Sequence, residues 1–395
     1  MAGGGTGGHL YPGLAVAEAI RTLQPEAAIA FSCTRRPIDR QVLAACGYAV
    51  TPTSARPFRL APWTWPALAV SLVRSGNQAR RRFREFCPDV VLGLGGYGSY
   101  APVRVGRKYG AATAVLNPDI VPGRANRRLA KRSDRIFCQF EETVALLGDG
   151  ARLTGCPVRP SLFACTRTEG REAFGLDADR RTLLVTGASL GARTVNRAVV
   201  AMLRQRGLPE GWQVLHLTGR GEYEEVSASY EAIAVPAAVR PYAERMGLAY
   251  AAADLAVARA GASTIAELLA AAVPAVFMPY PFHRDRHQMR QARAVEATGA
   301  AIVVEDRPDD PGTWERLAET VAALMTDPGR LASMRQSARA TGRRHAADEV
   351  ARQVLELADG VTVHRHAGME ANPADRRDVD TAARAPYTSS GDAER

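Results

Sequence analysis

Short apolar runs alternate with amphipathic stretches along most of this chain. In the first half, apolar segments such as 27–32, 90–94 and 112–116 are separated by helical patterns such as 66–86. The same alternation resumes at the apolar run 182–185. Strands that alternate with helices indicate parallel sheets covered by helices on both faces. We therefore predict an α/β protein with two Rossmann-like, doubly wound parallel-sheet domains that face a cleft.

A segment rich in glycine and proline begins at Thr154 and separates the two alternating series. It divides the chain into an N-terminal domain, residues 1–153, and a C-terminal domain, residues 154–335. Helical patterns over 336–360 are expected to close the C-terminal domain. Residues 361–395 are polar, contain proline and lack periodicity, so we predict a disordered tail.

One kind of glycine-rich turn occurs three times, over residues 3–9, 93–99 and 187–193. Each turn leads into a potential helix, and the last two follow apolar runs. Glycine lets the backbone approach a phosphate closely, and the free N–H groups of a helix start point at it. A single copy could be an ordinary tight turn. Three copies predict phosphorylated ligands held from both halves of the chain.

The composition is that of a globular protein, with 46% hydrophobic and 23% charged residues. No apolar run approaches the roughly 20 residues that span a bilayer, and no export leader is recognisable. The six cysteines form no C-x-x-C pair and no His/Cys cluster, which indicates a reducing compartment and no structural metal. Asp177 and Asp179 resemble a metal-binding DxD pair, but they lie in the predicted connection, where we expect a solvated turn.

The net charge of +10 is concentrated in two arginine-rich stretches, 74–84 and 124–135. They could be solvated helix faces, or surfaces for nucleic acid or anionic lipid. No zinc spacing or RNA-binding signature supports nucleic acid. Large apolar residues precede the first stretch: Trp63, Trp65, Leu68, Val70, Leu72 and Val73. This combination predicts a membrane-surface helix, although an amphipathic core helix with a basic outer face has the same pattern.

Several ordered motifs carry a family resemblance. They are Gly3–His9 followed by Tyr11–Ala15, Gly93–Tyr97, Asn117 with Pro122–Arg127, Thr154–Arg159, Ala188–Arg193, Arg259–Glu267, Pro279–Pro281, and His287–Gln288. From Met1 to about Leu357, the chain resembles the MurG family of bacterial transferases. These enzymes move N-acetylglucosamine from UDP-N-acetylglucosamine (UDP-GlcNAc) onto lipid I, the lipid-linked muramyl-pentapeptide precursor of peptidoglycan.

The resemblance implies a GT-B fold, with an N-terminal acceptor and membrane-facing domain and a C-terminal donor domain. It implies single displacement with inversion at the sugar, onto the C4 hydroxyl of the muramic acid of lipid I, giving lipid II. No cofactor or metal is expected, and no nucleic acid partner. The expected place of action is the cytoplasmic face of the plasma (inner) membrane, where the protein would bind the anionic surface peripherally.

On the donor side, the resemblance implies that the turn at Ser189 binds the diphosphate and that Glu267 binds the ribose. It places Arg259 at the donor site and Gln288 on the sugar hydroxyls, and Arg159 would stabilise charge on the leaving group. An amide both donates and accepts, which suits discrimination between sugar epimers. The matching uracil segment contains Tyr242, Ala243 and Met246.

On the acceptor side, His9 is the leading general-base candidate because a group with a pKa near neutral suits proton removal from a hydroxyl. Asn117 would line the cleft and could serve as an orienting group, and the sequence leaves open which residue takes the proton. The remaining predicted contacts are glycine-turn residues. Thr6 in the first turn and Gly95, Gly96 and Tyr97 in the second would bind the acceptor and its diphosphate. Thr6, Gly7 and Gly8 would also contact UDP-GlcNAc, together with His9 and Asn117.

Some positions depart from the family pattern. Only Met1 and Ala2 precede the first glycine turn, where the family has a buried strand, so we expect the first strand to be missing and the sequence to begin at an internal methionine. Leu190 replaces a glutamine and Gln291 an asparagine, which could alter donor choice or activity. Two alternatives stay open: another GT-B enzyme, such as a glycolipid synthase or a UDP-GlcNAc 2-epimerase, and a weakened UDP-sugar-binding protein.

Overall fold

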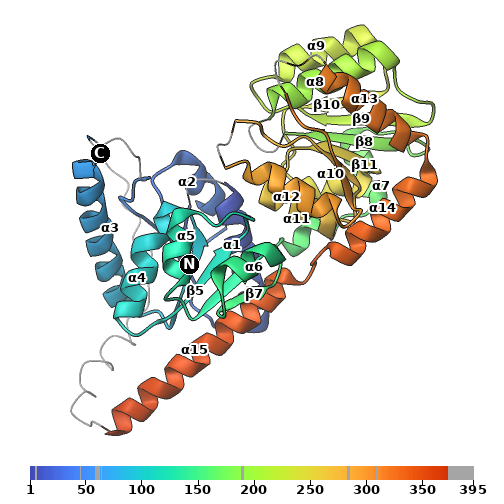
Figure 1. Cartoon of the computed structure of the whole chain (residues 1–395). Coiled ribbons are helices and arrows are strands. Elements are labelled where there is room, and N and C mark those ends of the chain that lie inside the picture. The colour runs from blue at the N-terminus through green and yellow to red at the C-terminus, as the bar shows by residue number, and fades with distance from the viewer. Residues whose placement is uncertain are drawn as a thin grey trace.

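The computed structural model describes residues 1–4, 7–44, 46–57, 63, 65–187, 191–282, 285–307, 310 and 312–371. It consists of two α/β lobes, and the C-terminal helix returns from the second lobe to the first (Figure 1). Thr6, Ser189 and Leu190, which belong to the predicted first and third glycine turns, lie outside the described residues.

The N-terminal lobe contains a seven-stranded, fully parallel sheet in the order β3-β2-β1-β4-β5-β6-β7. Its strands are β1 Ala2–Gly3, β2 Ala30–Cys33, β3 Ala49–Pro52, β4 Val90–Gly95, β5 Ala112–Asn117, β6 Arg135–Cys138 and β7 Ala151–Leu153. Its helices are α1 Gly7–Leu23, α2 Pro37–Ala44, α3 Trp65–Phe86, α4 Tyr100–Lys108, α5 Arg124–Ala130 and α6 Glu141–Leu147. The strand order reverses between β1 and β4, which places their carboxyl ends where α/β proteins bind ligands.

The C-terminal lobe contains a six-stranded parallel sheet in the order β10-β9-β8-β11-β12-β13. Its strands are β8 Arg181–Thr186, β9 Trp212–Leu217, β10 Ala237–Arg240, β11 Leu255–Ala258, β12 Ala275–Phe277 and β13 Ala301–Val303. Its helices are α7 Arg167–Phe174, α8 Arg193–Arg206, α9 Tyr223–Ile233, α10 Met246–Ala252, α11 Ala262–Ala270, α12 His287–Glu296, α13 Gly312–Met325 and α14 Pro328–Thr341. The prediction of two doubly wound parallel-sheet domains is confirmed.

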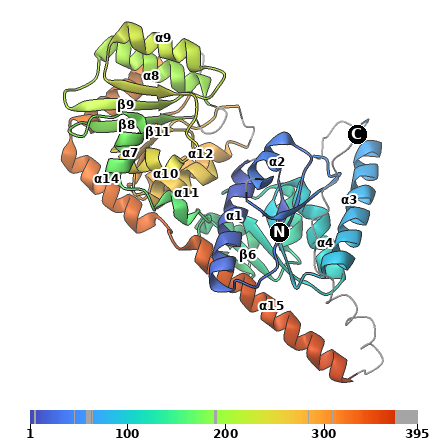
Figure 2. The ribbon, with the colours of Figure 1, turned by 180° about the vertical axis from the view of Figure 1, so that it is seen from behind.

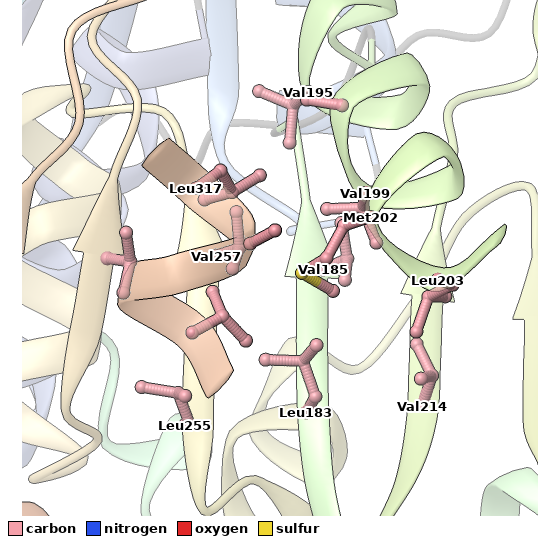
Figure 3. Packing of buried hydrophobic residues seen from close by; sticks show 14 of the residues in the cluster. Leu183, Val185, Val195, Val199, Met202, Leu203, Val214, Leu255, Val257 and Leu317 are labelled. Carbon is pink, nitrogen blue, oxygen red and sulfur yellow. The ribbon is translucent and has the colours of Figure 1, made fainter. Parts of the chain in front are cut away.

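Apolar side chains cover both faces of the second sheet. On one face, Val185 and Val257 pack with Val199 of α8 and Leu317 of α13 (Figure 3). Leu184, the neighbour of Val185, points to the other face and belongs to a second cluster. Successive strand residues point to opposite faces, so a strand between two helical layers needs a continuous apolar run. This is why the runs are recognisable in the sequence.

The expectation that the first strand is missing is wrong for this chain. Ala2 and Gly3 form a two-residue β1 that pairs with both β2 and β4. The Met1 amine donates to the Ala30 carbonyl at 2.8 Å, and Ser32 N–H donates to the Met1 carbonyl at 2.8 Å. Glycine is needed in this strand and in α1, because a Cβ atom at Gly3 or Gly13 would lie 2.6 Å or less from the side chain of Leu94, which is fully buried.

The expectation that the last helices close the C-terminal domain is half wrong. Helix α14 stays with the second lobe, but α15, Ala346–Ala371, packs on the first lobe (Figure 2). Its apolar stripe joins the same core as Leu14 of α1 and contains Ala347, Val350, Ala351 and Val354. The helix also continues past residue 361, the predicted start of the disordered tail.

Among the described residues, no helix is both long enough and apolar enough to cross a membrane.

Candidate functional site

The first and second glycine turns lie side by side, and the His9 ring lies against the second. Gly95 and Gly96 have φ angles of 101° and 72°, which favour glycine. A Cβ atom at Gly95 would lie 2.9 Å from His9 Cδ2, and one at Gly96 would lie 2.9 Å from the Gly4 carbonyl oxygen. Two glycines in sequence are therefore required for the imidazole to sit at the end of β4.

The surroundings of His9 favour its neutral form. Burial lowers the pKa of the imidazole, while the Asp119 carboxylate, a hydrogen bond to the backbone of Gly4 and the Asp39 carboxylate act in the opposite direction. Because the pKa stays below its ordinary value, the ring is neutral near pH 7. A neutral imidazole in the first turn of a helix has a lone pair with which to accept a proton.

Asn117 lies at the end of β5, and both ends of its buried amide are already bonded. Its Nδ2 donates to the Asp119 carbonyl at 2.6 Å, and its Oδ1 accepts from Asn126 Nδ2 at 2.9 Å. Asn126 also donates to the Leu116 carbonyl at 3.2 Å. These bonds fix the loop after β5 and, with it, the carboxylate of Asp119 near His9.

Tyr97 begins the short 3₁₀ turn Tyr97–Ser99 that follows the second glycine turn, and its side chain is half-buried. Gly7 and Gly8 form the start of α1. The structure thus brings the described acceptor-side residues together at the carboxyl ends of β1, β4 and β5.

The first turns of α1 and α11 meet across the two lobes. Ser263, in the first turn of α11, donates from its hydroxyl to the Gly8 carbonyl at 3.3 Å. Both helices present the positive ends of their dipoles and free N–H groups to this place. Because each helix N-terminus favours an anion, we expect an electropositive position where these two lie close together.

Glu267, on α11, belongs to a group of hydroxyl and carboxyl side chains behind this meeting point. Tyr250 donates to Glu267 Oε2 at 2.7 Å. Burial raises the pKa of Glu267 to about 7, and the bond from Tyr250 opposes that shift. Tyr11 of α1 is hydrogen-bonded to Tyr242, and burial together with Tyr242 and Glu267 raises the pKa of Tyr11 to about 12. This group joins the first lobe to the predicted uracil segment of the second.

Arg259, at the end of β11, is held in place by its own lobe. Its buried guanidinium pairs with Asp306 at 2.6 Å and donates to the Met278 carbonyl at 2.8 Å and to Thr194 Oγ1 at 2.5 Å. Thr194 lies in the first turn of α8, directly after the third glycine turn. Arg259 therefore fixes the start of α8, while direct contact with a ligand stays a prediction.

Gln288 lies in the first turn of α12, and its Oε1 accepts from Tyr280 N–H at 2.9 Å. Arg159, in the segment between the lobes, pairs with Glu18 of α1 through Nε at 2.9 Å and Nη2 at 2.5 Å. Both ion-pair partners are partly exposed. The Arg159 side chain is thus directed to the flank of α1, and its proposed role on the leaving group is untested.

Gln291 has a structural function that sequence reasoning missed. It is fully buried, accepts from Ile120 N–H of the first lobe at 3.2 Å and donates to the Ala260 carbonyl of the second at 2.8 Å. The sequence contains a signal for the burial of Gln291, because this residue shares the buried face of α12 with Ala292 and Val295. The family pattern points only to donor choice or activity at this position. In the structure, Gln291 connects the lobes through the loop that contains Asp119.

Both halves of the chain match known families. Residues 1–138 match the glycosyltransferase family 28 N-terminal domain, and residues 182–350 match the glycosyltransferase family 28 C-terminal domain. Relatives carry the name UDP-N-acetylglucosamine–N-acetylmuramyl-(pentapeptide) pyrophosphoryl-undecaprenol N-acetylglucosamine transferase. The one from Nocardioides sp. is 39% identical, covering 91% of this chain and 98% of its own. The one from Desulforamulus reducens is 33% identical, covering 90% and 98%.

Solved structures share the arrangement of the two lobes. The crystal structure of Acinetobacter baumannii MurG has a TM-score of 0.70 at 24% identity and covers 90% of this chain and 98% of its own. CalG4, the calicheamicin glycosyltransferase, has a TM-score of 0.60 at 15% identity, with 90% and 97% covered. At these identities the likeness concerns the fold, and it confirms the predicted GT-B architecture.

Proposed function

We propose that this chain moves N-acetylglucosamine from UDP-GlcNAc to the C4 hydroxyl of the muramic acid of lipid I. The product is lipid II. The chain belongs to the MurG-type transferases of glycosyltransferase family 28. The observation that supports this proposal is the contact between the first turns of α1 and α11, the helices that carry His9 and Glu267. An anionic diphosphate fits the electropositive position between these helix starts.

The proposed reaction is a single displacement. The acceptor oxygen forms a bond to the anomeric carbon as the bond from that carbon to the UDP oxygen breaks, so the configuration inverts. The neutral His9 imidazole takes the hydroxyl proton. UDP leaves with the electron pair, and backbone N–H groups of the glycine turns stabilise its growing charge. Asn117 acts as a positioning residue, because both of its amide atoms hold the loop beside His9.

On the donor side, Glu267 accepts from the ribose hydroxyls in its ionised form, and Gln288 reads the sugar hydroxyls. Thr6, Ser189 and the first-turn glycines Gly7 and Gly8 supply further contacts to the two diphosphates. Arg259 supports the donor site by fixing the start of α8, because its guanidinium is already shared between Asp306 and Thr194.

Helix α3 supports a peripheral place on the anionic, cytoplasmic face of the plasma membrane. Its buried face carries Ser71, Ser75 and Ala79, whereas Trp63 before it and Val73 on it are 82% and 63% exposed. A core helix would bury its large apolar residues and expose its small polar ones. The reversed arrangement, beside five arginines between residues 74 and 84, fits the boundary of an anionic bilayer.

A transfer assay tests the proposal. Labelled N-acetylglucosamine from UDP-GlcNAc should appear on a short-chain lipid I analogue. Transfer only to another lipid would favour a different GT-B enzyme. Tight UDP binding without any transfer would favour a UDP-sugar-binding protein, and either result would refute the proposal.

A further inference from the structure

We propose that the C-terminal lobe carries a second anion site, for a small molecule with at least two phosphate groups, at the edge of its sheet remote from the cleft. A cavity of about 630 Å³ opens there. Arg181 begins β8 and Asp254 directly precedes β11, so the cavity lies at the amino ends of these neighbouring strands. The proposed transfer reaction uses the carboxyl ends.

Two helices complete the walls of this cavity. Helices α7 and α14 lie side by side in both views of the molecule (Figures 1 and 2). Arg167 is the first residue of α7. One face of α14 supplies the other lining residues, which are Pro328, Leu331, Ala332, Arg335, Gln336 and Arg339. The lining therefore combines apolar side chains of α14 with arginines from both helices and from β8.

The pocket contains more positive than negative charge. Four arginines and one carboxylate, that of Asp254, line it. Asp254 accepts from Thr182 N–H at 2.9 Å, pairs with Arg167 and lies 3.6 Å from Arg335 Nη2. The Asp254 carboxylate is therefore already bonded to the backbone and shared by two of the four arginines. Within the described part of the chain, the guanidiniums of Arg181 and Arg339 have no ion pair or hydrogen bond.

The crowding of these cations affects Arg335 directly. Burial lowers its pKa, and the charges of Arg167 and Arg339 lower it further, against the attraction of Asp254. Bringing like charges into one partly buried pocket is unfavourable unless an anion neutralises them. A ligand with adjacent negative groups would remove this repulsion.

Phosphate groups suit the pocket better than other anions. The planar guanidinium binds a phosphate with two parallel hydrogen bonds. Two unpaired guanidiniums, together with two that share one carboxylate, offer several such forks to a ligand with more than one phosphate. The carboxylates of an extended acidic peptide are spread more widely along the chain. A volume of about 630 Å³ lies within the range of small-molecule sites and accommodates a nucleotide-sized ligand.

Calorimetric titration with inorganic pyrophosphate tests this inference on the full chain, with saturating UDP present to occupy the donor side of the cleft. The test variant is Arg181→Gln/Arg339→Gln. These side chains make no hydrogen bond or ion pair among the described residues, so the fold should be kept, which circular dichroism verifies. The matched control is Arg204→Gln/Arg330→Gln, two exposed arginines of the same lobe outside the pocket.

We expect the wild type and the control variant to bind pyrophosphate equally, and the test variant to bind it at least about tenfold more weakly. Absence of binding by the wild type, or equal binding by all three proteins, would overturn the proposal. A polyglutamate peptide serves as the comparison ligand. If it binds through Arg181 and Arg339 while pyrophosphate does not, the site takes an acidic protein segment and the proposal is wrong.

Discussion

The two lobes shape their sides of the cleft by different means. In the first lobe, the absence of side chains at Gly95 and Gly96 lets the backbone lie against His9. In the second lobe, buried side chains hold one another, as in the pairing of Arg259 with Asp306. The first side depends on free space and the second on paired charge. Mutations on the first side should therefore mainly impair activity, and mutations on the second side should mainly lower stability.

The largest effect is expected at the base in the first lobe. His9→Ala should lower the rate of sugar transfer by about 10²–10⁴-fold, because the acceptor hydroxyl loses its proton acceptor. UDP affinity, measured by calorimetry, should stay near the wild-type value, since the donor side is unchanged. His345→Ala is the control, because this histidine is 86% exposed and belongs to the segment before α15. Unchanged turnover in His9→Ala would exclude His9 as the base.

In the second lobe, a mutation of the buried Arg259–Asp306 ion pair should lower the stability of the protein. Asp306→Asn leaves the Arg259 guanidinium buried without its carboxylate, which should cost about 3–5 kcal/mol of unfolding free energy. Urea denaturation measures this loss. Glu225→Gln is the matched control, because its partner Arg197 lies 3.9 Å away and both side chains are exposed. Its loss of unfolding free energy should stay below about 1 kcal/mol. Equal losses in the two variants would show that the buried pair contributes no more to stability than the exposed pair.

A smaller loss of activity is expected from glycine variants of the first lobe. Two such variants separate the effect of backbone strain from that of a steric clash with His9. Gly95→Ala and Gly110→Ala both place a side chain at positive φ, 101° and 82°, and each should cost about 1–2 kcal/mol of stability. Only the Cβ at position 95 meets His9, at 2.9 Å, while nothing lies within 4 Å at position 110. Turnover should therefore fall about tenfold or more in Gly95→Ala alone. Equal turnover of the two variants would contradict the contact.

The last prediction concerns the pH dependence of stability and a buried carboxyl group of the second lobe. The pKa of Glu267 is about 7 in the folded chain, against 4.5 ordinarily. Between these values the folded protein keeps a proton that the unfolded chain has lost, so this group makes stability decrease as pH rises through the window. Glu267→Gln should remove that contribution. Thermal unfolding of the wild type and of Glu267→Gln between pH 4.5 and about 7 measures this contribution. Parallel plots of stability against pH for the two proteins would refute the pKa shift.

The sequence is sufficient for predicting the sheets but not every packing partner. Continuous apolar runs such as 182–185 specify buried parallel strands, and glycine turns mark their ends. The stripe around Val350 predicts a helix, but an apolar stripe does not state which lobe it covers. Similarly, Gln291 and Arg159 are assigned by family position, while their partners Ile120 and Glu18 are distant in sequence. Such contacts depend on how the lobes dock.

The route of the C-terminal helix has a consequence for synthesis on the ribosome. The core of the first lobe includes Val350 and Val354, which are translated after the entire second lobe. The lobe that emerges first therefore remains with an uncovered apolar surface until the second has been made. We expect the nascent first lobe to need a chaperone or the emerging second lobe for protection, and its folding to be completed last.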